Sequence, residues 1–209
     1  KNIVGMLLND AIRLIRGKKG TEVVLTVKKK DGSQQQISLI RDVIEYDEVF
    51  ARSSVITDEK GDKYGIIYLP EFYTPMGKEG GRYPTDDIKK EIEVLKKENI
   101  KGLIFDVRNN GGGSLEEVVK ISGLFINQGP IVQVRRSDGM LKIHEDKDNS
   151  ISYDGPLVVM VNELSASASE IFAAAMQDYG RAVIVGSPQT FGKGTVQTIL
   201  PLDRNTGSD

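Results

Sequence analysis

Hydrophobic and polar positions alternate along this chain in a way that predicts strands and helices in turn. Two stretches, residues 115–126 and 168–178, have apolar positions on one helical face. Short apolar runs typical of strands lie before, between and after them, at residues 101–107, 131–135, 157–161, 182–186 and 195–199. This alternation predicts an α/β fold built in layers.

The region before residue 101 continues the pattern. Alternating residues 49–55 predict an edge strand, and residues 63–70 predict a buried strand ended by Pro70. The glycine- and proline-rich residues 71–84 predict a loop. A charged amphipathic helix is predicted over residues 86–98, with Ile88, Ile92 and Leu95 facing inward.

The first forty residues predict one helix and one hairpin. Residues 9–16 form an amphipathic helical pattern followed by Gly17, and the alternating runs 22–27 and 36–40 flank an Asp31-Gly32 turn signal. These elements are too few to bury a core of their own.

Composition narrows the function classes. The chain has 209 residues, 39% hydrophobic and 28% charged, with a net charge of −2, which suits one domain plus a fragment. We expect no membrane span and no signal peptide, because no apolar run is long enough for the first and no such segment opens the sequence. The absence of cysteine excludes disulfides, thiolate metal sites and a cysteine nucleophile. The mild charge argues against nucleic acid as a partner.

The best candidate for covalent chemistry is the serine cluster at residues 165–170, between the strand 157–161 and the helix 168–178. A strand-to-helix turn exposes a side chain beside helix N–H groups that stabilise negative charge. The same residues, from Ser167 to Glu170, also fit the S-x-x-E capping box, in which the serine only satisfies a backbone donor. Both interpretations stay open on these residues alone.

A serine nucleophile needs a base. The one histidine, His144, lies in a charge-dense run that predicts a surface loop, which disfavours a Ser-His-Asp triad. Lys193 lies between two glycines in an uncharged segment, where burial would favour its neutral form and allow a Ser-Lys dyad. The alternative is an ordinary surface charge, since the chain has 28 Lys and Arg residues.

The glycine run at residues 111–113 follows a buried strand and precedes a capped helix. Glycines let the backbone approach a ligand and present N–H groups to it, as an oxyanion hole requires. A tight turn without further function is the alternative. Neither this run nor residues 186–195 has the spacing of a dinucleotide or P-loop motif.

Residues 164–182 and 190–197, together with the D-x-R-x-N-x-G-G block at 106–113, resemble the C-terminal processing peptidases, most closely the tail-specific proteases of Gram-negative bacteria. The resemblance implies a Ser167 nucleophile and a Lys193 general base, which Gln197 orients. It also implicates Asp178, whose alternative role is an exposed acid at a helix end. The implied oxyanion hole uses the amides of Gly112, Gly113 and Ala168.

The resemblance also implies the architecture. Residues 5–25 resemble the last third of a PDZ domain, so we expect residues 1–44 to be the C-terminal part of a PDZ domain. Residues 45–209 would form a crotonase-like or Clp-protease-like peptidase core that is truncated at its C-terminal end.

The resemblance therefore implies a serine endopeptidase that recognises unstructured C-terminal tails of proteins and cleaves them with a Ser167/Lys193 dyad. It also implies an adaptor protein as a possible partner and a periplasmic or envelope location in a Gram-negative bacterium. We expect no metal, cofactor or coenzyme. Two alternatives remain, namely a non-catalytic peptide-binding module and an acyl-transfer enzyme of the crotonase class.

Overall fold

The computed structural model describes residues 3–42, 49–75 and 81–197. The chain divides into two compact units, residues 1–46 and 47–209. The two units are described separately.

The first unit contains one helix and one antiparallel hairpin, as predicted. Helix α1 spans Leu8–Ile15, and strands β1 (Glu22–Lys28) and β2 (Gln34–Ile40) pair in full register. Arg41 ties the hairpin to the helix, because its Nε donates to the carbonyl of Ile15 at 2.7 Å. Ala11 is the only buried residue among those described in this unit, which agrees with the expectation that these elements bury no core alone.

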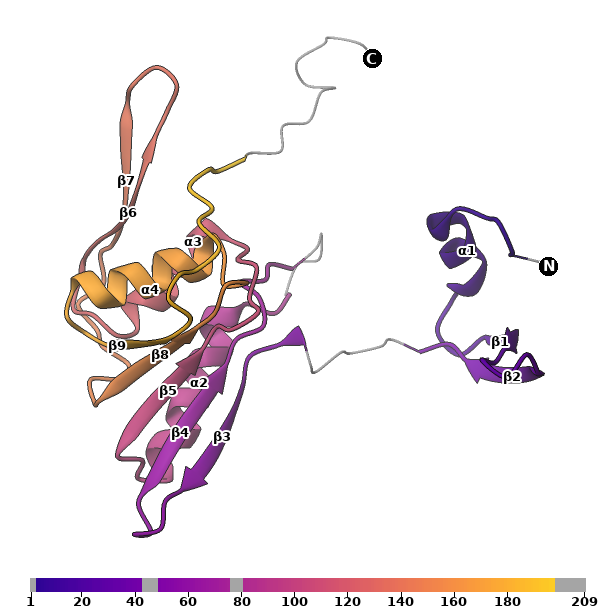
Figure 1. Cartoon of the computed structure of the whole chain (residues 1–209), viewed down its shortest axis with the longest axis horizontal. Helices are drawn as coiled ribbons and strands as arrows, with labels where there is room; N and C mark the ends of the chain where they lie inside the picture. The colour runs from indigo at the N-terminus through magenta and orange to yellow at the C-terminus, as the bar shows by residue number, and fades with distance from the viewer. Residues whose placement is uncertain (1–2, 43–48, 76–80, 198–209) are drawn as a thin grey trace. The chain divides into compact units, whose positions relative to one another are not determined.

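The second unit is built on a five-stranded sheet (Figure 1). Its strands lie in the order β3-β4-β5-β8-β9, with β3 antiparallel to β4 and the other neighbours parallel. Because β3 is at one edge, the predicted edge strand is confirmed. The bounds are β3 Arg52–Thr57, β4 Lys63–Tyr68, β5 Gly102–Asp106, β8 Leu157–Val161 and β9 Val183–Gly186.

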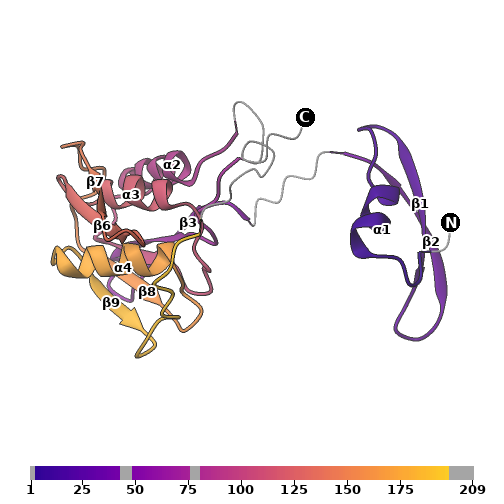
Figure 2. The same ribbon diagram turned by 90° about the horizontal axis from the view of Figure 1, so that it is seen from above.

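Three helices cover one face of this sheet (Figure 2). They are α2 (Pro84–Lys97), α3 (Leu115–Gly123) and α4 (Ala168–Asp178). A Cβ at Gly65 of β4 would lie 2.8 Å from Leu95 of α2. On the same face of β5, the ring of Phe105 packs against Phe172 of α4, with 4.7 Å between centroids. The predicted α/β layering is confirmed.

The core lies between the helices and the sheet. The rings of Phe105, Phe125 and Phe172 contact one another and are fully buried. Each buried side chain of this size contributes about 1.5–3 kcal/mol relative to exposure. Helix α2 buries Ile88, Ile92 and Leu95 as predicted. This packing determines where the ends of β5, β8 and α4 meet.

Two predictions about local structure are wrong. His144 lies in strand β7 (Leu141–Asp146) and not in a loop; β7 pairs with β6 (Gly129–Arg135) in a hairpin that extends from the core (Figure 1). The charges of β7 conceal it in the sequence, because an exposed two-stranded ribbon needs few apolar residues. Asp138-Gly139 at the turn was the available signal.

The second wrong prediction is the strand at 195–199. Residues 195–197 have no regular structure, and residues 198–199 lie outside the described residues. Within the predicted loop 71–84, residues 76–80 also lie outside them. Helix α2 begins at Pro84, two residues before its predicted start. A proline in the first helical position and the two acidic residues of the first turn, Asp86 and Asp87, both favour a helix N-terminus there. No helix in the described ranges is long and apolar enough to cross a membrane.

Candidate active site

Ser167 occupies a strained turn between β8 and α4. It is the N-cap residue of α4 and has φ 55° and ψ −112°, one of few non-glycine residues with positive φ in the described chain. Such a backbone costs on the order of 1–3 kcal/mol and persists only where surrounding contacts enforce it. The half-buried Ser167 side chain is thereby presented at the N-terminus of a helix, as the sequence predicts.

The glycine loop after β5 packs directly against this turn. Gly112 is buried with φ 106°, and a Cβ there would lie 2.7 Å from the Cβ of Ser167 and 2.9 Å from the carbonyl oxygen of Ala166. Gly113 has φ 133°, and a Cβ there would overlap the carbonyl oxygen of Phe72. Glycine is therefore required at both positions for steric reasons as well as for their backbone angles.

Two backbone amides beside Ser167 have no acceptor within the described part of the chain, those of Gly113 and Ala168. The amide of Gly112 differs, because it donates to Oδ1 of Asn110 at 2.9 Å. Gly113 is also exposed whereas Gly112 is buried. Of the three residues predicted to supply an oxyanion hole, Gly113 and Ala168 thus have N–H groups available to a ligand.

A pocket of about 100 Å³ brings most of the predicted site residues together. Its lining includes Ser167, Lys193 and Gln197 together with the free amides of Gly113 and Ala168. Apolar side chains complete the walls, namely Leu115, Ile171 and Val196. Segments about 80 residues apart in the sequence therefore converge on one serine.

Asp178 does not line this pocket. It is the last residue of α4 and is exposed, whereas Ser167 immediately precedes the first residue. At 1.5 Å per residue the two ends of this helix are about 15 Å apart. Any influence of Asp178 on the pocket must act through the helix and not by contact.

Lys193 is exposed, as in the surface-charge alternative, and its uncharged neighbours do not bury it. No hydrogen bond joins its Nζ to Oγ of Ser167 in the part of the chain described, and Nε2 of Gln197 donates to Oγ1 of Thr195 at 3.4 Å. Residues 191–197 are all exposed. An uncharged composition favours burial only where another element covers the segment, and none of the described elements does.

Glu170 connects the serine turn to the lysine-bearing segment. Its Oε2 accepts hydrogen bonds from the amides of Ser167 at 2.7 Å and Lys193 at 3.0 Å. Its Oε1 accepts from Oγ1 of Thr190 at 2.7 Å and from the amide of Gly192 at 2.6 Å. Burial, the largest single influence, would raise the pKa of Glu170, but the four donated hydrogen bonds together hold this pKa below its ordinary value.

The capping-box prediction identified only part of this role. Glu170 does accept from the N-cap amide of Ser167, as the motif requires. The bonds from Thr190, Gly192 and Lys193 join residues twenty or more positions apart, and no local motif indicates such contacts.

Sequence reasoning also missed three buried polar residues around the turn, Asn110, Ser165 and Ser169, each 0% exposed. Buried polar groups need hydrogen-bond partners. The hydroxyl groups of Ser165 and Ser169 donate to carbonyls of the opposite loop, whereas the side chain of Asn110 bonds to Leu69 and Gly112. The serines flanking Ser167 were visible in the sequence, but nothing there indicated where their hydroxyl groups point.

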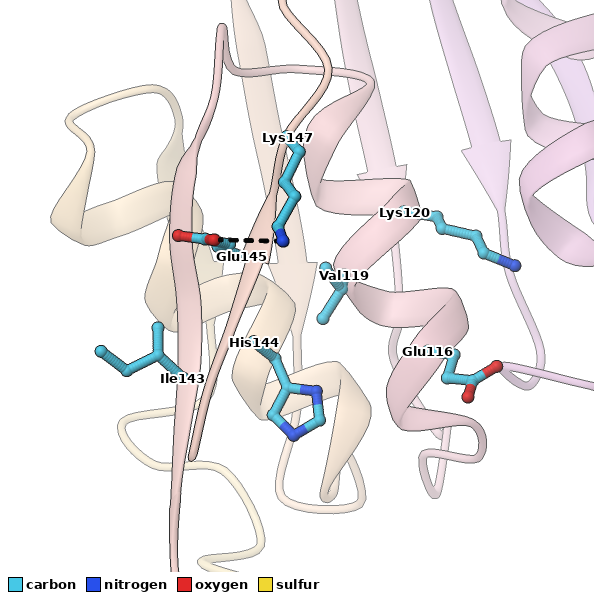
Figure 3. A pocket seen from close by; sticks show the side chains of 7 residues that line it. All are labelled: Glu116, Val119, Lys120, Ile143, His144, Glu145 and Lys147. Carbon is cyan, nitrogen blue, oxygen red and sulfur yellow. Dashed lines mark ion pairs between the residues drawn. The ribbon is translucent and has the colours of Figure 1, made fainter. Parts of the chain in front are cut away.

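His144 lies in a different pocket, between α3 and β7 (Figure 3). Its neighbours there include Glu116, Val119 and Lys120 of α3 and the Glu145–Lys147 ion pair, at 3.7 Å. None of these residues lines the Ser167 pocket. The structure therefore gives no support to a triad using His144. Among the described residues, no three His, Asp or Glu side chains are placed to hold a metal ion.

Comparisons with known proteins agree with the geometry. A tail-specific protease from Haemophilus influenzae is 45% identical over 200 residues, which are 94% of this chain and 27% of that protein. A carboxy-terminal processing protease from Bacillus subtilis is 35% identical over 205 residues, 97% of this chain and 40% of that protein. Among solved structures, a photosystem II D1 C-terminal processing protease is similar with a TM-score of 0.62 and 28% identity, over 93% of this chain and 50% of that one.

The chain spans at most half the length of these relatives. The resemblance to C-terminal processing peptidases predicted from residues 164–182 and 190–197 is confirmed. Residues 63–208 match Peptidase family S41, and this match covers both the serine turn and the lysine-bearing segment. The chain therefore belongs to peptidase family S41.

Proposed function

We propose that this protein is a serine endopeptidase in which Ser167 is the nucleophile and Lys193 the general base. The observation that carries the proposal is the pocket shared by Ser167, Lys193 and the two free amides of Gly113 and Ala168. A nucleophile, a base and two oxyanion donors are the groups that acyl transfer requires.

The reaction follows from these roles. Oγ of Ser167 attacks the scissile carbonyl carbon as neutral Lys193 accepts the hydroxyl proton, and the amides of Gly113 and Ala168 donate to the oxyanion. Lys193 then protonates the leaving amine, which leaves an ester on Ser167. A water molecule, deprotonated by Lys193, attacks the ester carbonyl, and Lys193 returns the proton to Oγ of Ser167 as the carboxylate product leaves. Gln197 orients the lysine during these proton transfers.

Substrate binding changes the surroundings of the proposed base. Lys193 is exposed in this structure, and a peptide that fills the pocket would exclude water from its Nζ. The apolar walls formed by Leu115, Ile171 and Val196, and the volume of about 100 Å³, suit a small apolar side chain next to the scissile bond.

We infer the substrate class from the relatives, whose names describe tail-specific and carboxy-terminal processing proteases. The substrates would be proteins with unstructured C-terminal tails, delivered with or without an adaptor protein. Residues 1–44 would be the C-terminal part of a PDZ domain, and the peptidase core would be crotonase-like. We expect a periplasmic or envelope location, as for tail-specific proteases of Gram-negative bacteria.

Cleavage of a tail-bearing peptide by the parent and by Ser167→Ala tests the function. The parent should release products at an internal peptide bond, identified by mass spectrometry, and Ser167→Ala should not. Binding of the peptide without cleavage by the parent would instead favour a peptide-binding module. Binding of coenzyme A without peptide cleavage would favour an acyl-transfer enzyme of the crotonase class.

A further inference from the structure

The nucleophile turn (residues 162–169) and the oxyanion loop (residues 107–113) come from distant parts of the sequence, yet their spacing sets the geometry of the pocket. Three hydrogen bonds join them at buried residues. Oγ of Ser165 donates to the carbonyl of Val107 at 2.8 Å. The carbonyl of Asn110 accepts from the amide of Ala166 at 3.0 Å and from Oγ of Ser169 at 2.9 Å.

Asn110 links these bonds to the glycines. Its side chain is fully buried, with Oδ1 accepting from the amide of Gly112 at 2.9 Å and Nδ2 donating to the carbonyl of Leu69 at 2.9 Å. Its own amide donates to the carbonyl of Val107 at 3.2 Å. Because both ends of the side chain and both backbone groups have partners, Asn110 has one well-determined position.

The amides of the two glycines differ. That of Gly112 donates to Asn110, whereas that of Gly113 has no acceptor among the described residues, and Gly113 lines the pocket. The hydroxyl of Ser169 holds the same asparagine from the helix that Ser167 caps. One short path therefore runs from the nucleophile through Ser169 and Asn110 to the oxyanion donor.

We propose that Ser169 and Asn110 are positioning residues, which set the distance between Oγ of Ser167 and the N–H of Gly113. The proposal rests on the proposed function, because it assumes that these two groups act on one carbonyl. Neither positioning residue lines the pocket, so neither contacts substrate. Their effect is to keep the donor aligned with the oxyanion as it forms.

The expected effect is on the chemical step. Removing an oxyanion donor lowers kcat by about 10²–10³-fold, and a misplacement of about 1 Å can cost about 10²-fold. In Ser169→Ala the carbonyl of Asn110 keeps its bond from Ala166, so we expect a loss of about tenfold. In Asn110→Ala both side-chain bonds disappear, and we expect a loss of about 10²-fold.

Ser122→Ala is a matched control. Ser122 is also 0% exposed, and its Oγ donates to the carbonyl of Val118 at 2.7 Å within α3. Both substitutions remove one buried hydroxyl that donates to one carbonyl, but only Ser169 connects the two loops.

The experiment measures, for the full chain, the rate of labelling by a serine-directed peptide phosphonate, together with kcat, KM and the pH profile for a tail peptide. We expect Ser169→Ala to lower the labelling rate and kcat about tenfold with KM and the pH profile unchanged, and Ser122→Ala to match the parent. Ser169→Cys keeps a weak hydrogen-bond donor, so its labelling rate and kcat should lie between those of Ser169→Ala and Ser122→Ala. Circular dichroism and thermal unfolding check the fold, and Ser169→Cys replaces the alanine variant if that variant does not fold.

Equal labelling rates for the folded Ser169 variants and Ser122→Ala would overturn the proposal, as would a shifted pH profile, which would indicate an effect on the base. A parent protein that is neither labelled nor active would instead refute the proposed function itself. The two failures are therefore distinguishable.

Discussion

The nucleophile turn and the lysine-bearing segment (residues 190–197) line the same pocket, but the fold holds them very differently. The turn follows a buried parallel strand, starts a helix, and is bonded through Ser165, Ala166 and Ser169 to the opposite loop. The lysine-bearing segment has no regular structure, and residues 191–197 are exposed. It is bonded to Glu170 of α4 and, through the amide of Phe191, to the carbonyl of Ser165 in the turn, at 3.0 Å.

We infer from this difference that the two regions have separate roles in catalysis. The serine and its oxyanion donors are preorganised before substrate arrives, which is where electrostatic stabilisation is most effective. The base is held mainly by one carboxylate, so its approach to Ser167 can depend on substrate. We therefore expect substitutions in the turn to act on chemistry without loss of the fold, and substitutions at Glu170 to act on the base.

The largest effect is expected for Ser167→Ala. Cleavage should fall by at least about 10⁴-fold, because removing the nucleophile of a catalytic unit abolishes the covalent route. Stability should change by no more than about 2 kcal/mol, the upper range for loss of a helix cap. Peptide cleavage and urea unfolding measure the two quantities. Parental turnover by this variant would show that another group is the nucleophile.

The second-largest effect is expected for Lys193→Arg, which should lower kcat by about 10²–10⁴-fold. Arginine keeps the positive charge and most of the reach but stays protonated, so it cannot accept the serine proton. The cleavage assay with a tail peptide measures kcat for the parent and the variant. If lysine only attracted a substrate carboxylate, arginine would retain most of the activity, which the same assay would reveal.

Gly112→Ala tests the close contact between the loop and the turn. The added Cβ would meet Ser167 at 2.7 Å with the backbone at φ 106°, so we expect a destabilisation of about 1–3 kcal/mol and a clear loss of activity. Gly111→Ala is the control, since a Cβ there meets nothing within 4 Å. Equal thermal stability and activity of the two variants would contradict the proposed packing.

Glu170→Gln should have a smaller effect, about tenfold on kcat, because an amide keeps one acceptor oxygen but places an NH₂ group against backbone donors. Glu163→Gln is its control, as the exposed Glu163 accepts one bond from Ser187 at 2.7 Å outside the pocket. A loss confined to KM would argue against a role for Glu170 in placing the base.

The same carboxylate predicts a pH dependence of stability. The folded-state pKa of Glu170 lies below its ordinary value of 4.5, so its stabilising contribution is present above pH 4.5 and is lost as pH falls through the lowered pKa. Thermal unfolding between pH 6 and 3 should show a shallower acid slope for Glu170→Gln than for the parent. Identical slopes would mean that these hydrogen bonds contribute no pH-dependent stability.

The sequence predicted most of the elements that position the nucleophile turn and the oxyanion loop. Apolar runs located β5, β8 and α4, and the residue types at their ends indicated the serine cluster and the glycine run. The family resemblance singled out Ser167, Gly112 and Gly113 among them. The sequence could not predict that Gly112 and Gly113 differ, because this depends on the side chain of Asn110. The conformation of this loop depends on hydrogen bonds to a turn that lies 50 or more residues away in the sequence.

The lysine-bearing segment and strand β7 were predicted less well. The sequence left open whether Lys193 is buried or exposed, and glycine-rich chain without a covering element stays exposed. Strand β7 was missed because only Leu141 and Ile143 among its six residues are apolar. The bonds from residues 190–193 to Glu170 have no local signature. In each case the missing information is the tertiary partner and not the residue type.

Peptide mapping of the phosphonate adduct tests the central claim most directly. The parent protein is treated with a serine-directed peptide phosphonate, digested, and analysed by mass spectrometry, with Ser167→Ala treated in parallel. The account predicts one adduct, on Ser167, and none in the variant. An adduct on Ser165, Ser169 or another residue, or labelling that persists in Ser167→Ala, would contradict it.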